Sequence, residues 1–408
     1  MRALAPAVLL ILASSACSRE IVPEAYAPTG AHDAYRHALA QAGLDRTALG
    51  RDWAKASELA LRFPTEVAAP FEETFYADSG EAFALGYRFK VKYGQRTEVK
   101  LEIDPPSDWR IFVDLFRAPE GGDEGPEPVA SGGEGDLRLA FEPRKDGTYL
   151  LRVQSELLRG GRGTLVIRNV ASLEFPVEGL GSQAIGSSFG APREGGRRSH
   201  HGVDIFAPRG TVVRATSRAR VRRVDEWRLG GRVIWLEDPE RDLRLYFAHL
   251  ETQEVVEGTW VEPGDRIGTV GNSGNARTTP PHLHFGIYVR GRGPIDPYPF
   301  LYQPPQSPSA IRADRERLGG WVRTRRKAVP LLAGPYQPPG AGEARLLDLP
   351  PGTPLRVWGA IGSTLRVEIQ GGMTGFIASG ETEVLEPPLR GFPLEDRREK
   401  PSPLVTSE

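Results

Sequence analysis

The sequence predicts a mainly β protein that consists of several domains. With 408 residues, the chain is longer than a single hydrophobic core usually accommodates, so two to four domains are expected. Its 47 glycines and 36 prolines indicate many turns between short strands. In the first half of the chain, apolar and polar residues alternate with a period of two, which is the pattern of half-buried antiparallel strands. Strands should therefore outnumber helices.

The charges of the chain nearly cancel, and this limits the partners that it can have. There are 52 lysines and arginines against 53 aspartates and glutamates. Binding to nucleic acid usually requires a clear excess of positive charge, so no nucleic-acid partner is expected. The proportions of hydrophobic residues (39%) and charged residues (26%) are typical of a folded soluble protein.

Residues 1–16 have the layout of a secretory signal peptide. Arg2 precedes an apolar run that ends at Leu12, and small residues stand directly before Cys17. Cys17 is the only cysteine of the chain, so it cannot form an intramolecular disulfide. Its setting resembles a bacterial lipobox, which implies lipidation of Cys17 at the mature N-terminus. Cleavage by an ordinary signal peptidase after Ala16 is the alternative.

The rest of the chain is expected to be exported and soluble. No other segment reaches the ~18 apolar residues that a membrane-spanning helix needs. We therefore expect the protein in the periplasm or cell envelope, where it would contact the membrane only through an N-terminal lipid anchor on Cys17.

Residues 17–69 are predicted to be a linker followed by two short helices. Gly43 separates two stretches in which apolar residues recur at helical spacing, and Pro64 follows the second stretch. The apolar positions are Tyr35, Leu39 and Ala42 in the first stretch, and Leu49, Trp53, Ala56 and Ala60 in the second.

Residues 70–172 are predicted to form a β-sandwich. Apolar residues alternate with polar ones in two neighbouring segments, 87–93 and 99–103, and Gly94 lies in the connection between them. The same alternation recurs in three later segments, at 137–141, 149–153 and 165–167. No cluster of catalytic residue types is visible in this region, so we expect it to be a spacer or a binding module.

A concentration of histidines marks the central part of the chain. Five of the seven histidines lie between positions 200 and 284, although a single histidine is more often an ordinary polar residue than a metal ligand. Their number and spacing in so short a stretch therefore indicate a functional site. These five are His200, His201, His249, His282 and His284.

The spacing of these residues favours a metal site. His282 and His284 are two apart in a predicted strand, so their imidazoles would share one face. His200 and Asp204 are four apart, and Gly202 between them permits a close approach of the backbone. Imidazole and carboxylate both suit zinc, and three protein ligands with one open position define a catalytic site. The lack of an available cysteine argues against a structural zinc site of the thiolate type.

Three motifs in this region resemble those of the M23 family of zinc metallopeptidases, also called LytM or lysostaphin-type domains. The His-x-x-x-Asp motif matches His200 to Asp204, and the His-x-His motif matches His282 to His284. The Tyr-x-His-Leu motif matches positions 247–250, with Phe247 in place of tyrosine. The resemblance implies an antiparallel-β peptidase domain, which we expect over residues 173–302.

The resemblance also implies the roles of the individual residues. His200, Asp204 and His284 would bind one Zn²⁺ ion, while His249 and His282 would be catalytic without binding the metal. His282 is the candidate general base, and His249 would help to hold the charge of the transition state. The sequence does not divide these two roles between them. His201 has no ligand counterpart in the family and is expected to be a wall or solvent-facing residue.

Two positions depart from the family pattern. Arg220 stands where the family commonly has glycine, and Gly286 stands where an acidic residue often follows the His-x-His-Phe run. Neither position binds metal, so we expect an altered cleft shape or altered hydrogen bonding around the ligands, and not a loss of zinc. The basic loop from Arg193 to Arg198 is expected either to form part of the cleft or to be a solvated turn.

The C-terminal part is predicted to contain one further small β domain. A proline-rich linker is expected at 303–318, and the segment 319–388 consists of short predicted strands that resemble bacterial SH3-like domains. The tail 389–408 is charged and is expected to be disordered. The expected strands are 329–332, 346–349, 354–358, 364–369 and 374–377.

Together these features predict a zinc metalloendopeptidase that hydrolyses peptide bonds in bacterial peptidoglycan crosslinks or stem peptides during cell-wall remodelling. SH3-like modules often accompany such hydrolases and hold the wall. The alternative is a non-catalytic LytM-type regulator that activates a cell-wall amidase, although such proteins typically lack the metal ligands. An endopeptidase that acts on proteins is a third possibility, because a zinc site does not encode its substrate.

Overall fold

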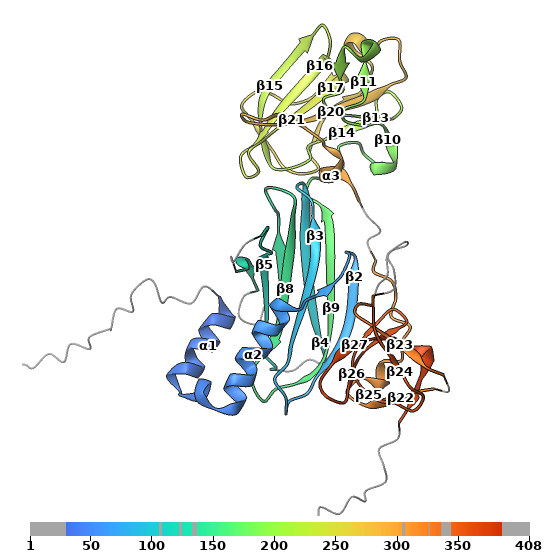
Figure 1. Ribbon diagram of the computed structural model, residues 1–408. Coiled ribbons are helices and arrows are strands. Elements are labelled where there is room, and N and C mark those ends of the chain that lie inside the picture. Colours follow the sequence, from blue (N-terminus) through green and yellow to red (C-terminus); the bar gives the residue numbers. More distant parts are fainter. Residues whose placement is uncertain are drawn as a thin grey trace, which may run out of the picture.

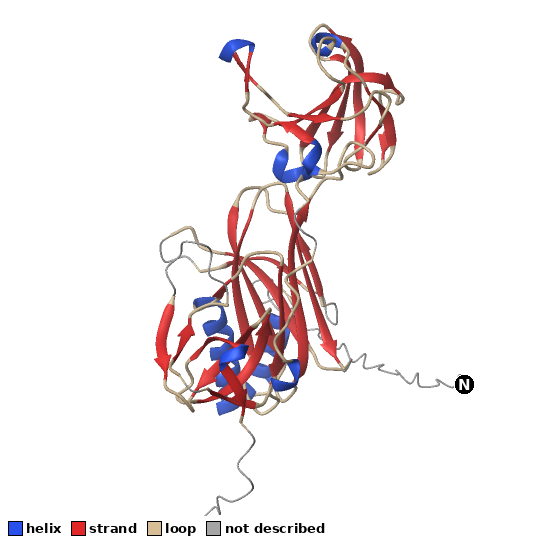
Figure 2. Ribbon diagram, turned by 90° about the vertical axis from the view of Figure 1, so that its right-hand side faces the viewer, coloured by secondary structure: helices blue, strands red, loops and turns tan. Residues whose placement is uncertain are grey.

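The computed structural model describes residues 30–105, 108–121, 125–132, 137–303, 307–325, 327–335 and 344–385. Within these ranges the fold is mainly β, as predicted, with two helices at the start (Figures 1 and 2). Figure 1 shows a long β-sandwich in the middle, a second β region above it, and the C-terminal strands beside its lower half. The predicted signal peptide, Cys17 and the tail 389–408 lie outside the described residues.

Two helices, α1 (Ala31–Gln41) and α2 (Ala48–Arg62), pack against the sandwich. Gly43 adopts a positive φ of 70° between them, which is the left-handed conformation that ends a helix. Trp53 of α2 is fully buried, and its indole nitrogen donates to the Ser155 carbonyl at 2.8 Å. Among the residues that the structure describes, no helix is both long and apolar enough to span a bilayer.

The sandwich consists of two sheets that enclose an apolar core. The alternation in the sequence points one set of side chains inward, and Phe75, Tyr149, Leu165 and Ile167 are completely buried between the sheets. The first sheet has the order β1 (Thr65–Glu66), β3 (Ala84–Val91), β8 (Gly147–Ser155), β5 (Ile111–Arg117) and β6 (Glu127–Ser131). The second contains β2 (Phe71–Ala77), β9 (Gly161–Ala171), β4 (Gln95–Asp104) and β7 (Arg138–Phe141).

The C-terminal strands extend the second sheet of the sandwich. Strand β25 pairs with β2, where Thr74 lies opposite Ala360 and Phe75 lies opposite Gly359. The sequence predicted that this strand ends at Trp358, but it continues to Ile361, and the added residues form the junction. The strands of this region are β22 (Trp321–Thr324), β23 (Val329–Leu332), β24 (Arg345–Leu349), β25 (Pro354–Ile361), β26 (Thr364–Ile369), β27 (Thr374–Ala378) and β28 (Thr382–Val384).

A buried ion pair fastens this junction. The Arg366 guanidinium donates to both carboxylate oxygens of Glu73, at 2.6 and 2.8 Å, and to the Thr65 hydroxyl at 3.0 Å. The Tyr87 hydroxyl donates to the same carboxylate at 2.9 Å. A Cβ atom on Gly359 would lie 2.3 Å from the Glu73 carboxylate, so glycine is needed there for the close approach. The C-terminal region is therefore joined to the sandwich by polar contacts that are removed from solvent.

The central region contains the third large sheet. Its main order is β10 (Ile185–Ser187), β13 (Val203–Phe206), β20 (His282–Val289), β17 (Leu243–Gln253), β16 (Gly231–Asp238), β15 (Ala219–Trp227) and β18 (Trp260–Val261). Strands β14 (Val212–Arg214), β19 (Arg266–Val270) and β21 (Gly293–Ile295) pair beside this path, and β11 (Pro192–Arg193) pairs with β12 (Arg198–Ser199). Phe247, Phe285 and Leu283 are fully buried in its core, so the alternate positions of β17 and β20 face outward.

The central region rests on the upper end of the sandwich. Phe300 of the short helix α3 (Tyr298–Leu301) packs against the Tyr93 ring at 5.0 Å between centroids. Arg241 also donates to both carboxylate oxygens of Glu142, each at 2.9 Å. These contacts lie far from the C-terminal strands, which occupy the lower half of the sandwich (Figure 1).

Loss of the buried carboxylate at the C-terminal junction should destabilise the protein. The variant Glu73→Ala would leave the Arg366 guanidinium buried without its partner, and we expect a loss of about 3–5 kcal/mol in the free energy of unfolding. Urea denaturation of the intact chain, followed by tryptophan fluorescence, measures this loss. Arg323→Gln is the control, because its pair with Glu383 is exposed and its removal should cost less than ~1 kcal/mol. Equal losses in both variants would contradict the expectation.

Candidate metal centre and catalytic cleft

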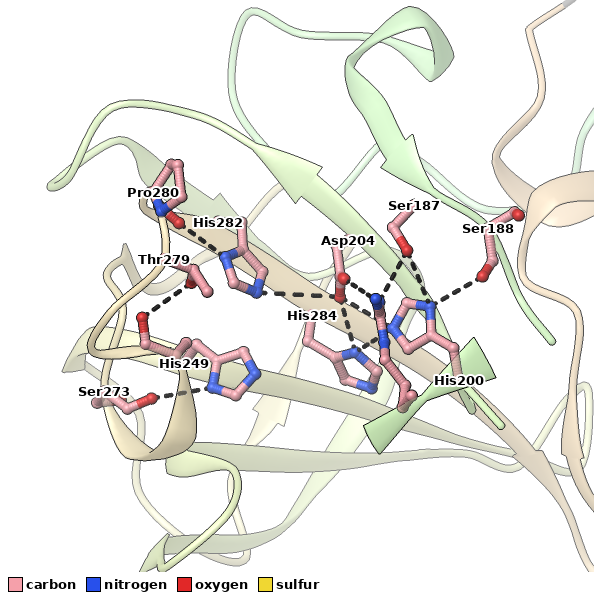
Figure 3. A network of polar contacts seen from close by, with 12 residues as sticks. Ser187, Ser188, His200, Asp204, His249, Ser273, Thr279, Pro280, His282 and His284 are labelled. Atoms are coloured by element: carbon pink, nitrogen blue, oxygen red, sulfur yellow. Dashed lines mark hydrogen bonds and ion pairs between the residues drawn. The ribbon is translucent and has the colours of Figure 1, made fainter. Parts of the chain in front are cut away.

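The pairing of β13 with β20 brings the candidate metal ligands together. In this antiparallel ladder, Asp204 lies directly opposite His284, and both side chains point to the same face of the sheet. His200 reaches the pair from the segment just before β13 (Figure 3). Gly202 is essential to this arrangement, because a Cβ atom there would lie 2.9 Å from the His284 ring and 2.3 Å from the Phe285 carbonyl.

Three ligand atoms form a nearly equilateral triangle. The His200 Nε2 atom lies 3.0 Å from Asp204 Oδ1 and 2.9 Å from His284 Nδ1, and the last two atoms are 3.0 Å apart. All three side chains are largely buried. Ligand atoms that bind zinc tetrahedrally at ~2.0–2.2 Å are about 3.3–3.6 Å apart, so the triangle needs to expand only slightly to hold the ion.

The hydrogen bonds around His200 indicate that a cation belongs in this triangle. His200 Nδ1 lies 2.9 Å from the Ser188 carbonyl oxygen, and a carbonyl only accepts, so Nδ1 carries the hydrogen. In the neutral imidazole, Nε2 then presents a lone pair to the lone pairs of Asp204 Oδ1. Two acceptors at 3.0 Å repel each other unless a positive charge lies between them. Nitrogen and oxygen donors of this kind suit Zn²⁺.

Asp204 is held in its charged form. Burial alone would raise the pKa of its carboxyl, but the neighbouring His200 and His284 rings outweigh burial and hold that pKa well below its usual range. Its second oxygen accepts from Arg193 at 2.5 Å, and Arg193 also donates to the Ser187 hydroxyl at 2.7 Å. The basic loop therefore contributes Arg193, which orients Asp204 through the carboxylate oxygen that lies outside the triangle. The sequence did not identify this contact.

His249 and His282 stand beside the triangle with one nitrogen free. Their Nδ1 atoms lie 3.0 Å from the Ser273 carbonyl and 2.9 Å from the Pro280 carbonyl, so in the neutral imidazoles both Nε2 atoms carry lone pairs. His282 Nε2 is 4.0 Å from Asp204 Oδ1, and the two imidazole rings are 5.0 Å apart (Figure 3). Burial lowers the pKa of His249 to about 4, and the charges of His282 and His284 act in the same direction. His249 is therefore neutral at neutral pH.

The backbone at His249 is strained. Its φ is 63°, in the left-handed region that non-glycine residues rarely adopt. A hydrogen bond from its amide to the Gly230 carbonyl at 2.8 Å holds this conformation. The backbone of β17 is therefore irregular at His249, where its register against β16 shifts, and this conformation aims the imidazole at the cleft at a cost of roughly 1–3 kcal/mol.

The five histidines line one open cavity of ≈ 730 Å³. His201 is on its wall, as expected for a residue that is not a ligand, and Arg193 lines it as well. The aromatic residues that line its other end were not foreseen from the sequence, although the period-two pattern of β15, β16, β17 and β20 could have placed them on the outer face. They are Trp227, Trp235, Tyr246 and Tyr288.

The two positions that depart from the family pattern, Arg220 and Gly286, lie in different places relative to the cavity. Arg220 is exposed and donates to the Gly258 carbonyl at 3.2 Å, outside the cavity. Gly286 lies opposite Tyr246 in the β17–β20 ladder, beneath the aromatic residues. The second departure therefore affects the shape of the cleft, whereas the first does not. Cys17, the predicted lipidation site, lies outside the described residues.

The central region is similar to a known family of peptidases. The model of peptidase family M23 matches residues 198–297. The chain is 42% identical over 117 residues to an L-Ala–D-Glu endopeptidase of Bacillus subtilis, a match that covers 26% of this chain and 36% of the relative. It is 31% identical over 125 residues to a peptidoglycan DD-endopeptidase of Vibrio cholerae, covering 31% of this chain and 28% of the relative.

A solved structure is also similar to part of the chain. The catalytic domain of lysostaphin from Staphylococcus simulans is 33% identical, with a TM-score of 0.27, and the match covers 28% of this chain and 90% of that domain. The curated relatives named above are matched over little more than a third of their length or less.

Replacement of His284 should remove the metal. We expect the wild-type chain to bind one zinc ion, and the variant His284→Ala to lose most of it, because only two of the three ligands would remain. Metal analysis of the purified, dialysed proteins measures the content. His201→Ala is the matched control and should keep its zinc. Full retention of zinc in His284→Ala would show that the metal binds elsewhere.

Arg193 should tune the affinity for the metal without being a ligand. The variant Arg193→Gln removes the charge that orients Asp204, and we expect zinc affinity to fall about 10–100-fold, the range seen for residues that orient ligands. Competition with a chelator gives the dissociation constant. Arg209→Gln removes an exposed pair with Glu251 in the same region and should leave the affinity unchanged. An equal effect of the two substitutions would contradict a specific role of Arg193.

Proposed function

We propose that this chain, whose residues 198–297 are a peptidase M23 domain, is a zinc-dependent endopeptidase that hydrolyses peptide bonds of bacterial peptidoglycan. The observation that carries the proposal is a complete donor triangle of His200, Asp204 and His284 with two further imidazoles turned toward it. The peptidoglycan substrate is supported by the relatives, two of which are named as an L-Ala–D-Glu endopeptidase and a peptidoglycan DD-endopeptidase.

A zinc ion bound to three protein ligands supplies a Lewis acid that activates water and polarises a carbonyl group. The protein contributes a base beside it. His282 Nε2 carries a lone pair and lies 4.0 Å from a ligand oxygen of Asp204, so His282 can accept the proton of the attacking water. Its Nδ1 hydrogen bond to Pro280 fixes the ring and stabilises the imidazolium that forms.

The same proton can then pass to the leaving amine, because the His282 imidazolium can act as a general acid. His249 lies one ring farther out, with centroids 5.0 Å from His282 and 6.0 Å from His284. Its neutral state leaves Nε2 as an acceptor, and once protonated it can donate to a negatively charged oxygen. His249 therefore assists proton transfer and charge stabilisation from the far side of the cleft.

The cleavage activity should depend on His249 although metal binding does not. We expect His249→Ala to keep one zinc per chain and to lose about 10²–10⁴-fold in rate, the usual contribution of a general acid or base. Purified wild-type and variant chains are incubated with peptidoglycan, with and without a chelator, and the released muropeptides are separated.

The control for this experiment is His201→Ala, which should cut at close to the wild-type rate. Unchanged peptidoglycan after incubation with zinc-loaded wild-type protein would overturn the proposed activity. A rate for His249→Ala equal to that of the control would overturn the role of His249 alone.

The alternative function, a non-catalytic regulator of a cell-wall amidase, is less well supported. Such a role requires no metal ligands, yet the three ligand positions are present and brought together. The same incubation separates the two functions. If the chain is a regulator, peptidoglycan fragments are released only when an amidase is added, and the His284→Ala variant supports this release as well as the wild-type chain does.

Export and attachment to the wall complete the proposal. Cys17 would carry a lipid that anchors the protein in the cell envelope, which agrees with a substrate outside the cytoplasm. Residues 319–388 would be an SH3-like module that contacts peptidoglycan. Because these strands lie along the lower half of the sandwich, the module would hold the wall at a distance from the cleft (Figure 1).

A further inference from the structure

The outer face of the central sheet continues from the metal site into a row of aligned side chains. In the ladder between β17 and β20, Ala248 lies opposite His284, and Arg244 lies opposite Tyr288. Between them, Tyr246 lies opposite Gly286. Residues two apart in a strand share a face, so Arg244 lies on the same face as the ligand His284.

Aromatic rings form the floor of this face. The Tyr246 ring lies 5.8 Å from the His284 ring and 4.5 Å from Trp235, which in turn lies 6.2 Å from Trp227. Gly286 leaves the room for this packing, because a Cβ atom there would lie 3.1 Å from the Tyr288 ring. The floor therefore starts at the metal site without an acidic side chain at position 286, and an extended peptide can lie across it.

The far end of the floor is cationic. A second cavity of ≈ 310 Å³ adjoins it and shares Trp227 and Trp235 with the catalytic cleft. Its other lining residues include three arginines, Arg222, Arg223 and Arg244.

Two of these arginines are available to a ligand. Arg222 is paired with Glu237 at 3.3 Å, whereas Arg223 and Arg244 are exposed and their side chains make no hydrogen bond or salt bridge to any residue that the structure describes. The nearby Asp225 carboxylate accepts from the Trp227 indole at 2.7 Å and from the Glu226 amide at 2.8 Å. The Asp225 charge also acts on Arg223, and Glu237 lies opposite Arg244 in the β16–β17 ladder. Three arginines therefore face two nearby carboxylates, which leaves a net positive charge at this end of the groove.

The distance to the metal site sets which part of a substrate could reach these arginines. Arg244 is four residues along β17 from Ala248, which lies beside His284. That separation is ~13 Å at the rise of a β-strand. An extended peptide covers ~3.3–3.6 Å per residue, so a group bound there lies about three to four residues from the bond that is cut.

We propose that Arg223 and Arg244 form a carboxylate subsite that selects peptides with a negative charge three to four residues from the scissile bond. The inference rests on the proposed endopeptidase function and names the class of peptide that this site takes. Arginine binds carboxylates through two parallel hydrogen bonds, and the aromatic floor excludes water beside it. A neutral, glycine-rich peptide would gain no binding affinity from these two arginines.

Paired peptides test the subsite. Two synthetic peptides with the same cleavable bond differ only at the third or fourth residue from it, which is D-glutamate in one and D-glutamine in the other. We expect the full-length wild-type chain to prefer the acidic peptide about tenfold or more in kcat/KM, and the variant R223Q/R244Q to lose that preference. The control variant R220Q also removes one arginine charge from strand β15, but at a position outside the groove. It should keep the preference for the acidic peptide.

A binding measurement separates this inference from the proposed activity. The full-length chain with His284→Ala should still bind the acidic peptide, which tryptophan fluorescence can follow through Trp227 and Trp235, and binding should weaken about tenfold or more for the amide. Preferential binding without any cleavage by the wild-type chain would overturn the activity and keep the subsite. Equal binding of both peptides, or an equal loss in R220Q, would overturn the subsite.

Discussion

The register between β13 and β20 is the constraint on which the site depends. It places Asp204 opposite His284, while Val203, Ile205, Leu283 and Phe285 fill the core on the other side. A shift of this ladder by one residue would turn every side chain to the other face, so it would bury the ligands and expose the apolar residues. The hydrophobic core therefore fixes the candidate metal site, so the stability of the domain and the proposed function depend on the same two strands.

Backbone carbonyls orient the imidazole rings of the cleft. The three imidazoles of His200, His249 and His282 each have Nδ1 beside a carbonyl oxygen, from Ser188, Ser273 and Pro280. Each ring is thereby held in the tautomer whose Nε2 lone pair faces the cleft. One of these lone pairs contributes to the donor triangle. In the proposed function the other two take part in proton transfer, so three chemically identical side chains would gain different roles from their positions alone.

The sequence predicted those parts of the structure that depend on short spacings. The mainly β fold followed from alternation and turn residues, and the two N-terminal helices followed from the helical spacing of apolar residues. His200, Asp204, His282 and His284 stood out because candidate ligands two or four residues apart are visible in the chain. Contacts between distant segments were not predictable in this way. Arg193 reaches Asp204 through a loop, and Glu73 meets Arg366 across 293 positions because β25 continues beyond its expected end. The aromatic floor required knowledge of which strands are neighbours.

The central claim is that two imidazoles and one carboxylate hold zinc while two further imidazoles remain free. X-ray absorption spectroscopy at the zinc edge of the full-length, zinc-loaded chain measures this most directly. The account predicts a shell of nitrogen and oxygen at ~2.0–2.2 Å in which two imidazoles contribute. Three or more coordinated imidazoles would mean that His249 or His282 binds the metal, and would contradict the division of roles proposed for this cleft.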